Sequence, residues 1–218
     1  TSTSNTIGSH GANNFVNENA EFNGWEAKDH YAISKYLAEI EAKKICEKGL
    51  PLVIVNPTLV IGVRDRKPTP SGALIVDIAN RNMPGYIEGA INVIDVEDVA
   101  RGHILAAQKG RNGERYLFGN ENLFVGEFFN LIAEIAGVKP PKLKIPYHIA
   151  LLLGYIFQFG ARISKKAPVV SVSQVRLGKM GEHFDCSKAI NELGLPQTPI
   201  KVTIEKAVNW YRDNGYIK

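Results

Sequence analysis

The residues of this 218-residue chain best suited to chemistry are Tyr31 and Lys35, a phenol and an ammonium four positions apart. On a helix, this spacing puts both side chains on one face, one turn from each other. A free phenol, with a pKa of about 10, transfers protons slowly at neutral pH, whereas a neighbouring cation stabilises the phenolate and favours proton transfer. The pair therefore suits a proton-transfer site, although tyrosine and lysine at this spacing also occur as an ordinary surface pair.

The surrounding sequence favours the catalytic interpretation. The segment Thr1–Ser4 supplies four hydroxyls about 28 residues before Tyr31, and one of them can hydrogen-bond a reacting carbonyl or alcohol. About 20 residues after the pair, an apolar segment leads into Asn56-Pro57. These neighbouring features favour the catalytic interpretation of the pair over that of an ordinary surface pair.

These side chains need elements to position them. Residues 1–24, rich in Ser, Asn and Gly, are predicted as the end of a strand followed by a long loop. Apolar residues near helical spacing predict a helix over 27–48, which carries Tyr31 and Lys35. The uniformly apolar segment 52–55 predicts a parallel strand buried on both faces. A helix followed by such a strand indicates an α/β sheet, in which ligands collect at the carboxyl ends of the strands.

The rest of the chain alternates predicted helices and strands. Asp95 and Asp98 resemble an acid pair but are better explained as cap and dipole partners of a helix start. Arg64, Arg66 and Lys67 suit either an anionic substrate or a solvated loop. Predicted helices cover 71–82, 99–109, 125–136, 145–161, 186–194 and 204–214, and extended segments cover 86–87, 91–94 and 114–119.

Composition argues against several classes of function. The net charge of +4 is spread along the chain without the dense basic block of a nucleic-acid binder. Cys46 and Cys186 lie 140 positions apart, and none of the five histidines shares a metal-like spacing with a carboxylate. We therefore expect neither a disulfide scaffold nor a metal site, and a reducing, cytoplasmic compartment is the default.

The longest apolar run, 145–161, is shorter than the ~20 residues that a bilayer span needs. It predicts a buried or amphipathic helix and no stable membrane span. Arg162, Lys165 and Lys166 follow directly, so a peripheral membrane contact stays open as the alternative.

Taken together, the motifs resemble the extended short-chain dehydrogenases/reductases, which include sugar-nucleotide epimerases and dihydroflavonol 4-reductases. Residues 1–8 resemble the end of the family's fifth strand, and Tyr31-x-x-Ser34-Lys35 matches its tyrosine motif. Residues 55–62 resemble its sixth strand and the following loop. Residues 92–100 resemble a signature of its substrate lobe, and 185–194 and 210–215 resemble its closing segments.

This resemblance implies the C-terminal part of a Rossmann-type doubly wound sheet plus a small mixed α/β substrate-binding lobe. Residues 1–62 are expected to belong to the dinucleotide-binding domain. Residues 63–218 are expected to form mostly the substrate lobe, interleaved with a returning strand and helix at about 90–110. The family's Gly-rich turn, which holds the pyrophosphate, is absent from these 218 residues. We therefore expect the C-terminal portion of a longer enzyme, which by itself binds a dinucleotide poorly.

The resemblance also implies roles for individual residues, with NAD or NADP as the cofactor and no metal. The implied catalytic residues are Thr3, Tyr31 and Lys35; the implied cofactor contacts are Tyr31, Lys35, Pro57 and Val60; the implied substrate contacts are Thr3, Asn56 and Arg64.

Within the family, residues 56–72 are closest to dihydroflavonol-reductase-like proteins and hopanoid-associated sugar epimerases. The expected activity is hydride transfer between NAD(P) and a carbonyl or alcohol carbon of a small molecule, with a homodimer as a candidate assembly. A sugar-nucleotide epimerase or dehydratase using the same residues is one alternative, and a non-catalytic binding protein that keeps the fold is another. A shared loop is not a shared ligand, so the substrate stays open.

Overall fold

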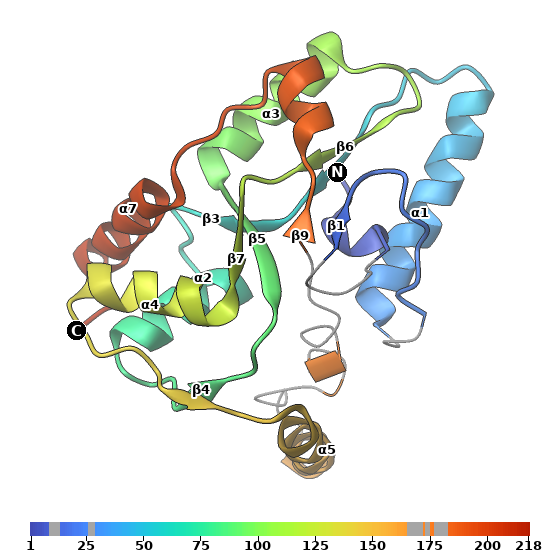
Figure 1. Cartoon of the computed structure of the whole chain (residues 1–218). Coiled ribbons are helices and arrows are strands. Elements are labelled where there is room, and N and C mark those ends of the chain that lie inside the picture. The colour runs from blue at the N-terminus through green and yellow to red at the C-terminus, as the bar shows by residue number, and fades with distance from the viewer. Residues whose placement is uncertain (9–13, 26–28, 165–171, 173–174, 177–182) are drawn as a thin grey trace.

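The computed structural model describes residues 1–8, 14–25, 29–164, 172, 175–176 and 183–218. Figure 1 shows a mixed α/β molecule in which helices surround a central group of short strands. His10, the predicted helix start at residue 27, and Lys165 and Lys166 lie outside the described residues. The α/β class and the parallel pairing expected from the sequence are confirmed.

Strands that are distant in the sequence pair mainly in parallel. The central strand β5 (Ala90–Asp95) lies between the parallel strand β3 (Leu59–Ile61) and the antiparallel strand β7 (Glu121–Phe124). Three further parallel pairs are β2 (Ile54–Pro57) with β6 (Arg115–Phe118), β1 (Phe15–Val16) with β9 (His183–Phe184), and β4 (Gly85–Tyr86) with β8 (Leu143–Lys144).

A helix forms at each predicted place. The bounds of α4 match the predicted 125–136, and α7 begins four residues before the predicted 204. The described α-helices are α1 (His30–Glu47), α2 (Pro70–Ala79), α3 (Val96–Lys109), α4 (Val125–Ala136), α5 (Tyr147–Ser164) and α7 (Ile200–Asp213). A 3-10 turn η1 (Ser4–Thr6) precedes α1, and a π-helical turn η2 (Ala189–Leu193) precedes α7.

The strand predictions were less accurate. The strand predicted at 52–55 begins at Ile54 and continues through Asn56 and Pro57. Thr1–Thr3 is not a strand: its Ser2 amide donates one hydrogen bond to the Val55 carbonyl at 2.8 Å before the chain turns into η1. β3, β7 and β1 were not predicted, because segments of two to four residues are too short for a recognisable alternation.

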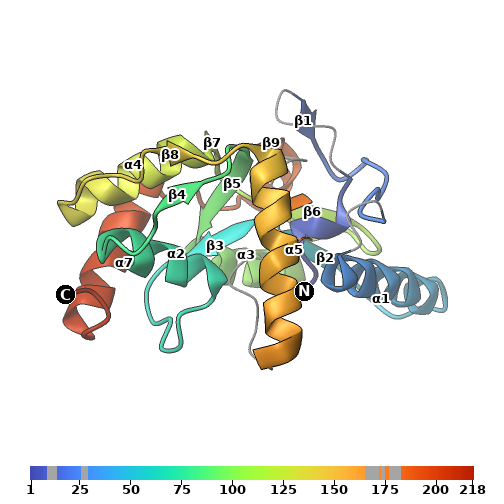
Figure 2. The ribbon, with the colours of Figure 1, turned by 90° about the horizontal axis from the view of Figure 1, so that it is seen from below.

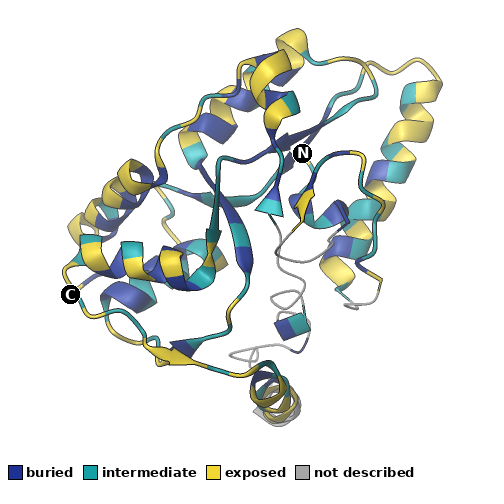
Figure 3. Ribbon diagram, viewed as in Figure 1, coloured by how far each residue is buried: buried dark blue, intermediate teal, exposed yellow. Residues whose placement is uncertain are grey.

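The interior consists of apolar clusters around the strands, as the dark blue segments of Figure 3 show. The largest cluster joins α2, α4 and α7 to β3 and β5, with Ile75, Phe128 and Ile204 fully buried. A second joins α3 and η2 to β2 and β6 through Val55, Phe118, Leu193 and their neighbours. Burying one such side chain contributes about 1.5–3 kcal/mol, so these clusters hold α2, α3, α4 and α7 firmly. Among the described residues, every helix falls short of the length and apolarity that crossing a membrane requires.

Candidate functional site

Tyr31 and Lys35 lie in the first two turns of α1. Asp29 caps the helix, because its Oδ1 accepts a hydrogen bond of 3.0 Å from the Tyr31 amide, and Ser34 Oγ donates to the Tyr31 carbonyl at 2.8 Å. The Tyr31 side chain is 52% exposed. Lys35 Nζ donates to the Thr1 carbonyl at 3.4 Å. The helix start therefore brings the ammonium against the N-terminal hydroxyl segment and leaves the phenol accessible.

The hydroxyl segment Thr1–Thr3 lies between β2 and α3. Thr1 Oγ1 lies 2.8 Å from His103 Nε2, while His103 Nδ1 lies 2.8 Å from the Val99 carbonyl. Because a carbonyl only accepts, His103 Nδ1 is the donor to Val99, and the other ring nitrogen faces the Thr1 hydroxyl. Thr3 Oγ1 accepts a hydrogen bond from the Asn5 amide at 3.3 Å, which leaves the hydroxyl proton of Thr3 available for another acceptor.

Asn56 supports this segment from the interior. It is fully buried, and its Nδ2 lies 3.0 Å from the Thr3 carbonyl and 2.7 Å from Glu39 Oε1. Its Oδ1 is also buried and has no hydrogen-bond partner among the described residues. The Asn56 amide nitrogen therefore holds the backbone of Thr3, which lies nearer the surface.

Glu39 is a buried charge that sequence reasoning missed. It lies four residues after Lys35 on α1, and only 5% of it is exposed. Its Oε1 accepts from Thr6 Oγ1 at 2.6 Å, and its Oε2 forms an ion pair of 3.5 Å with Arg115 on β6. Arg115 in turn donates to the Glu18 carbonyl. On sequence alone, Glu39 looked like any glutamate of a surface helix, because all of its partners come from other elements.

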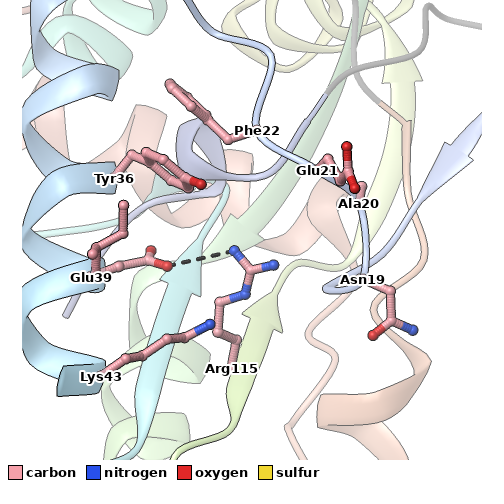
Figure 4. Close-up of a pocket in the computed structure, with 9 residues that line it drawn as sticks. Asn19, Ala20, Glu21, Phe22, Tyr36, Glu39, Lys43 and Arg115 are labelled. Atoms are coloured by element: carbon pink, nitrogen blue, oxygen red, sulfur yellow. Dashed lines mark ion pairs between the residues drawn. The ribbon is translucent and has the colours of Figure 1, made fainter.

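Figure 4 shows a pocket between residues 19–22 and one side of α1, with the Glu39–Arg115 ion pair pointing into it. The Tyr36 ring lines it and stacks on Phe22 with ring centroids 4.2 Å apart. Tyr31 and Lys35 are not among its lining residues. The pocket therefore lies beside the predicted chemistry and not at it.

Three other residues with implied contacts lie on β2, on β3 and in the next loop: Pro57, Val60 and Arg64. Pro57 lies opposite Phe118 in register, and Val60 lies opposite Ile94. The exposed Arg64 has a left-handed φ of 68°. A hydrogen bond joins Lys35 to Thr1, whereas no hydrogen bond or ion pair among the described residues joins Pro57, Val60 or Arg64 to Tyr31.

The loop that carries Arg64 is anchored by Asp65. Its Oδ2 accepts from the Thr69 amide at 2.8 Å and from the Tyr211 hydroxyl at 2.8 Å. Burial, together with the Asp65 carboxylate, raises the pKa of Tyr211 well above its ordinary value. Tyr211 is therefore a neutral hydrogen-bond donor that ties the loop to α7.

The structural interpretation of Asp95 and Asp98 is confirmed. Asp95 caps α3 by accepting from the Glu97 amide at 2.7 Å, and its other oxygen accepts from the buried Thr203 hydroxyl at 2.8 Å. Asp98 accepts from the amide and hydroxyl of Thr198, at 2.6 and 3.0 Å. Both carboxylates thus join α3 to the segment that leads into α7.

The two cysteines differ in environment. Cys186 is buried, and burial, with a contribution from the Glu18 carboxylate, raises the pKa of its thiol to about 12. Cys46 is partly exposed. Within the described ranges, His, Cys, Asp and Glu side chains form no cluster of three or more that could hold a metal ion.

Comparison with known proteins adds a family assignment to this geometry. The model of the NAD dependent epimerase/dehydratase family matches residues 1–119. A curated protein named "Putative dihydroflavonol 4-reductase" from Synechocystis is 38% identical over 192 residues, which are 86% of this chain and 56% of that protein. The chain therefore spans a little over half the length of this relative.

Two solved structures are similar over the whole chain. That of gox2253 has a TM-score of 0.85 and 35% identity, with 100% of this chain and 66% of that chain covered. That of a nucleoside-diphosphate-sugar epimerase from Pseudomonas aeruginosa has a TM-score of 0.81 and 29% identity, with coverages of 100% and 67%.

Proposed function

Because the chain belongs to the NAD-dependent epimerase/dehydratase family, we propose that the intact protein transfers hydride between NAD(P) and a carbonyl or alcohol carbon, as an extended short-chain dehydrogenase/reductase. The contact between Lys35 Nζ and the Thr1 carbonyl, at 3.4 Å, is the observation that carries this proposal. It joins the Tyr/Lys helix to the hydroxyl segment, as a shared site requires. In this proposal residues 1–62, with the strand and helix at about 90–110, belong to the dinucleotide-binding domain, and the rest of 63–218 is mostly the substrate lobe.

Tyr31 is the general acid/base of the proposed site. In the reducing direction, its phenol gives a proton to the oxygen of the substrate carbonyl as hydride reaches the carbon; in the oxidising direction, the phenolate takes the alcohol proton. Lys35, one turn away on the same helix, stabilises the phenolate electrostatically. The unused hydroxyl proton of Thr3 donates to the same substrate oxygen and orients it.

The residues of this chain fit the nicotinamide and ribose end of a dinucleotide, which supplies or takes up hydride when bound. Lys35 has three donor hydrogens, and its described contact with Thr1 engages one of them, so donors remain for ribose hydroxyls. Pro57 and Val60 would contact the nicotinamide. The family's Gly-rich turn is not among these 218 residues, so they do not supply its pyrophosphate site.

For the substrate, we propose a reductase of the dihydroflavonol-reductase-like type, since the relative with that name is 38% identical. Arg64, exposed in the loop after β3, would contact the substrate directly. Asn56 is fully buried and would act on the substrate through Thr3, whose carbonyl it holds at 3.0 Å. A sugar-nucleotide epimerase is the second candidate, favoured by the similarity to a solved enzyme of that title.

The test replaces Tyr31 by phenylalanine in the intact protein, assayed with NADPH and dihydroquercetin. Tyr31→Phe keeps the ring and removes the transferred proton, so we expect kcat to fall by about 100-fold or more. Tyr36→Phe is the matched control, because Tyr36 lies on the same helix and its ring stacks on Phe22. Full turnover by Tyr31→Phe would overturn the proposal.

Two further assays of the intact protein separate the alternatives. UDP-glucose converted to an isomer with NAD, without net change in NADH, would identify an epimerase. Fluorescence titration with NADH and NADPH addresses the third candidate: an intact protein that binds neither would be a non-catalytic member of the fold.

A further inference from the structure

Helix α5 exposes a continuous apolar face. Ile149, Leu152 and Ile156 recur at spacings of three and four residues, which puts them on one side of the helix, and they are 52%, 61% and 55% exposed. Ala150 and Gly154, both buried, lie on the opposite side. Figure 2 shows α5 running across the face of the molecule that is nearest the viewer. An exposed face of this kind marks an interaction site.

The segment that contains α5 is strongly basic. Residues 135–181 contain eight lysines and arginines and no aspartate or glutamate. The whole chain has a net charge of only +4, so the other residues carry an acidic excess. Lys142 and Lys144 are exposed just before α5, and Leu143 between them is 60% exposed. Lys144 pairs with Glu88 at 2.7 Å, and most of the other basic residues lie nearer the end of α5 or beyond it.

An amphipathic tyrosine borders the apolar face. Tyr155 is 51% exposed, and its hydroxyl accepts from Arg176 Nη2 at 3.2 Å. A half-exposed ring with a polar tip beside a guanidinium suits the boundary between hydrocarbon and water. The face thus combines exposed aliphatic side chains, an aromatic edge and positive charge.

We propose that α5 lies flat on an anionic lipid surface, with Ile149, Leu152 and Ile156 inserted among the acyl chains and the described basic residues Lys142 and Arg176 near the headgroups. Helices with one apolar face and a basic flank bind such interfaces. The three side chains extend over about 10 Å of one side of the helix, which fits a helix in the plane of the interface. A second copy of this chain fits less well, because symmetric contact would bring two segments that contain no aspartate or glutamate and several basic residues together.

Co-sedimentation of the intact protein with vesicles tests this proposal without cofactor or substrate, so its result is independent of the proposed reaction. We expect binding to phosphatidylcholine vesicles that contain about one third phosphatidylglycerol, at least fivefold weaker binding to phosphatidylcholine alone, and loss of binding at high salt. The double variant Leu152→Glu/Ile156→Glu should weaken the partition coefficient by about tenfold or more.

Ile104→Glu is the matched control, because Ile104 is 60% exposed on α3, outside the basic segment. It should bind the anionic vesicles as the unaltered protein does, and circular dichroism should show both variants folded. Absence of vesicle binding, equal binding to neutral vesicles, or an equal loss in Ile104→Glu would overturn the proposal. So would light scattering that shows a dimer which the double variant dissociates, since a second copy would then cover the face.

Discussion

Helices α1 and α4 are held by different kinds of force. α4 buries Phe128, Phe129 and Ile132 in the largest apolar cluster. α1 buries only Ala32 and Glu39 among its eighteen residues. Hydrocarbon packing is non-directional and stabilises in proportion to the area buried, whereas hydrogen bonds and ion pairs depend steeply on distance and angle. The structural part of the molecule therefore depends on packing, and the candidate site depends on polar geometry.

This difference suits a catalytic helix. Glu39 contacts Thr6, Asn56 and Arg115, so one carboxylate aligns α1 with η1, β2 and β6 together. Because these polar contacts require particular distances and angles, they restrict the orientation of the elements that they join more narrowly than apolar contacts do. We infer that the network sets the direction in which Tyr31 and Lys35 face.

The largest effect on stability is expected in the apolar cluster. Phe128→Ala removes a fully buried ring and should lower the free energy of unfolding by about 3–5 kcal/mol, measured by urea denaturation. Phe124→Ala is the control at the start of the same helix, where the ring is 39% exposed, and should cost far less. Equal losses of unfolding free energy in the two variants would contradict the proposal that packing of buried rings holds α4.

A somewhat smaller loss is expected at Glu39, where the effect should reach the site as well. Glu39→Ala leaves Arg115 without its ion-pair partner, and we expect a loss of about 3 kcal/mol in the free energy of unfolding. Glu39→Gln keeps an acceptor oxygen and should lose less. Glu41→Ala breaks an exposed pair with Lys44 on the same helix and should stay within about 0.5 kcal/mol. If Glu39→Ala behaved like Glu41→Ala, the polar network would not hold α1.

The hydroxyl of Thr203 offers a polar contact inside the packed region. Thr203→Val leaves Asp95 Oδ2 without its 2.8 Å donor and should cost about 1–3 kcal/mol in thermal or chemical unfolding. Thr203→Ser, which keeps the hydroxyl, separates the hydrogen bond from the lost methyl group. A neutral Thr203→Val would mean that the hydrogen bond between Thr203 and Asp95 does not contribute to stability.

The smallest expected effect on stability is at Glu18, whose backbone carbonyl accepts a hydrogen bond from Arg115. Burial raises the pKa of its carboxyl above the ordinary 4.5, against a lowering contribution from the Leu117 amide that donates to it. The folded state then binds more protons than the unfolded state between the two pKa values, so this group lowers stability as the pH rises through 4.5 toward the native value. Glu18→Gln should flatten that fall in pH-dependent denaturation curves, and an unchanged curve would contradict it.

The sequence by itself determined what depends on neighbours along the chain. The bounds of α4, the Asp95 cap and the four-residue spacing of Tyr31 and Lys35 follow from periodicity and capping, which act within a few residues. The tyrosine motif predicted the family only together with the hydroxyl segment before it and Asn56-Pro57 after it, and the helix followed by an apolar strand predicted the fold class.

Only the tertiary structure decided which residues meet across the chain. Leu37 and Ile45 carry the apolar spacing that predicted the helix, yet they are 48% and 50% exposed, while Glu39 is buried. Glu39 meets Thr6 and Asn56, 33 and 17 positions away, because β2 packs between η1 and β6. A charged residue becomes buried only where distant elements bring it partners, and a local pattern carries no information about those partners.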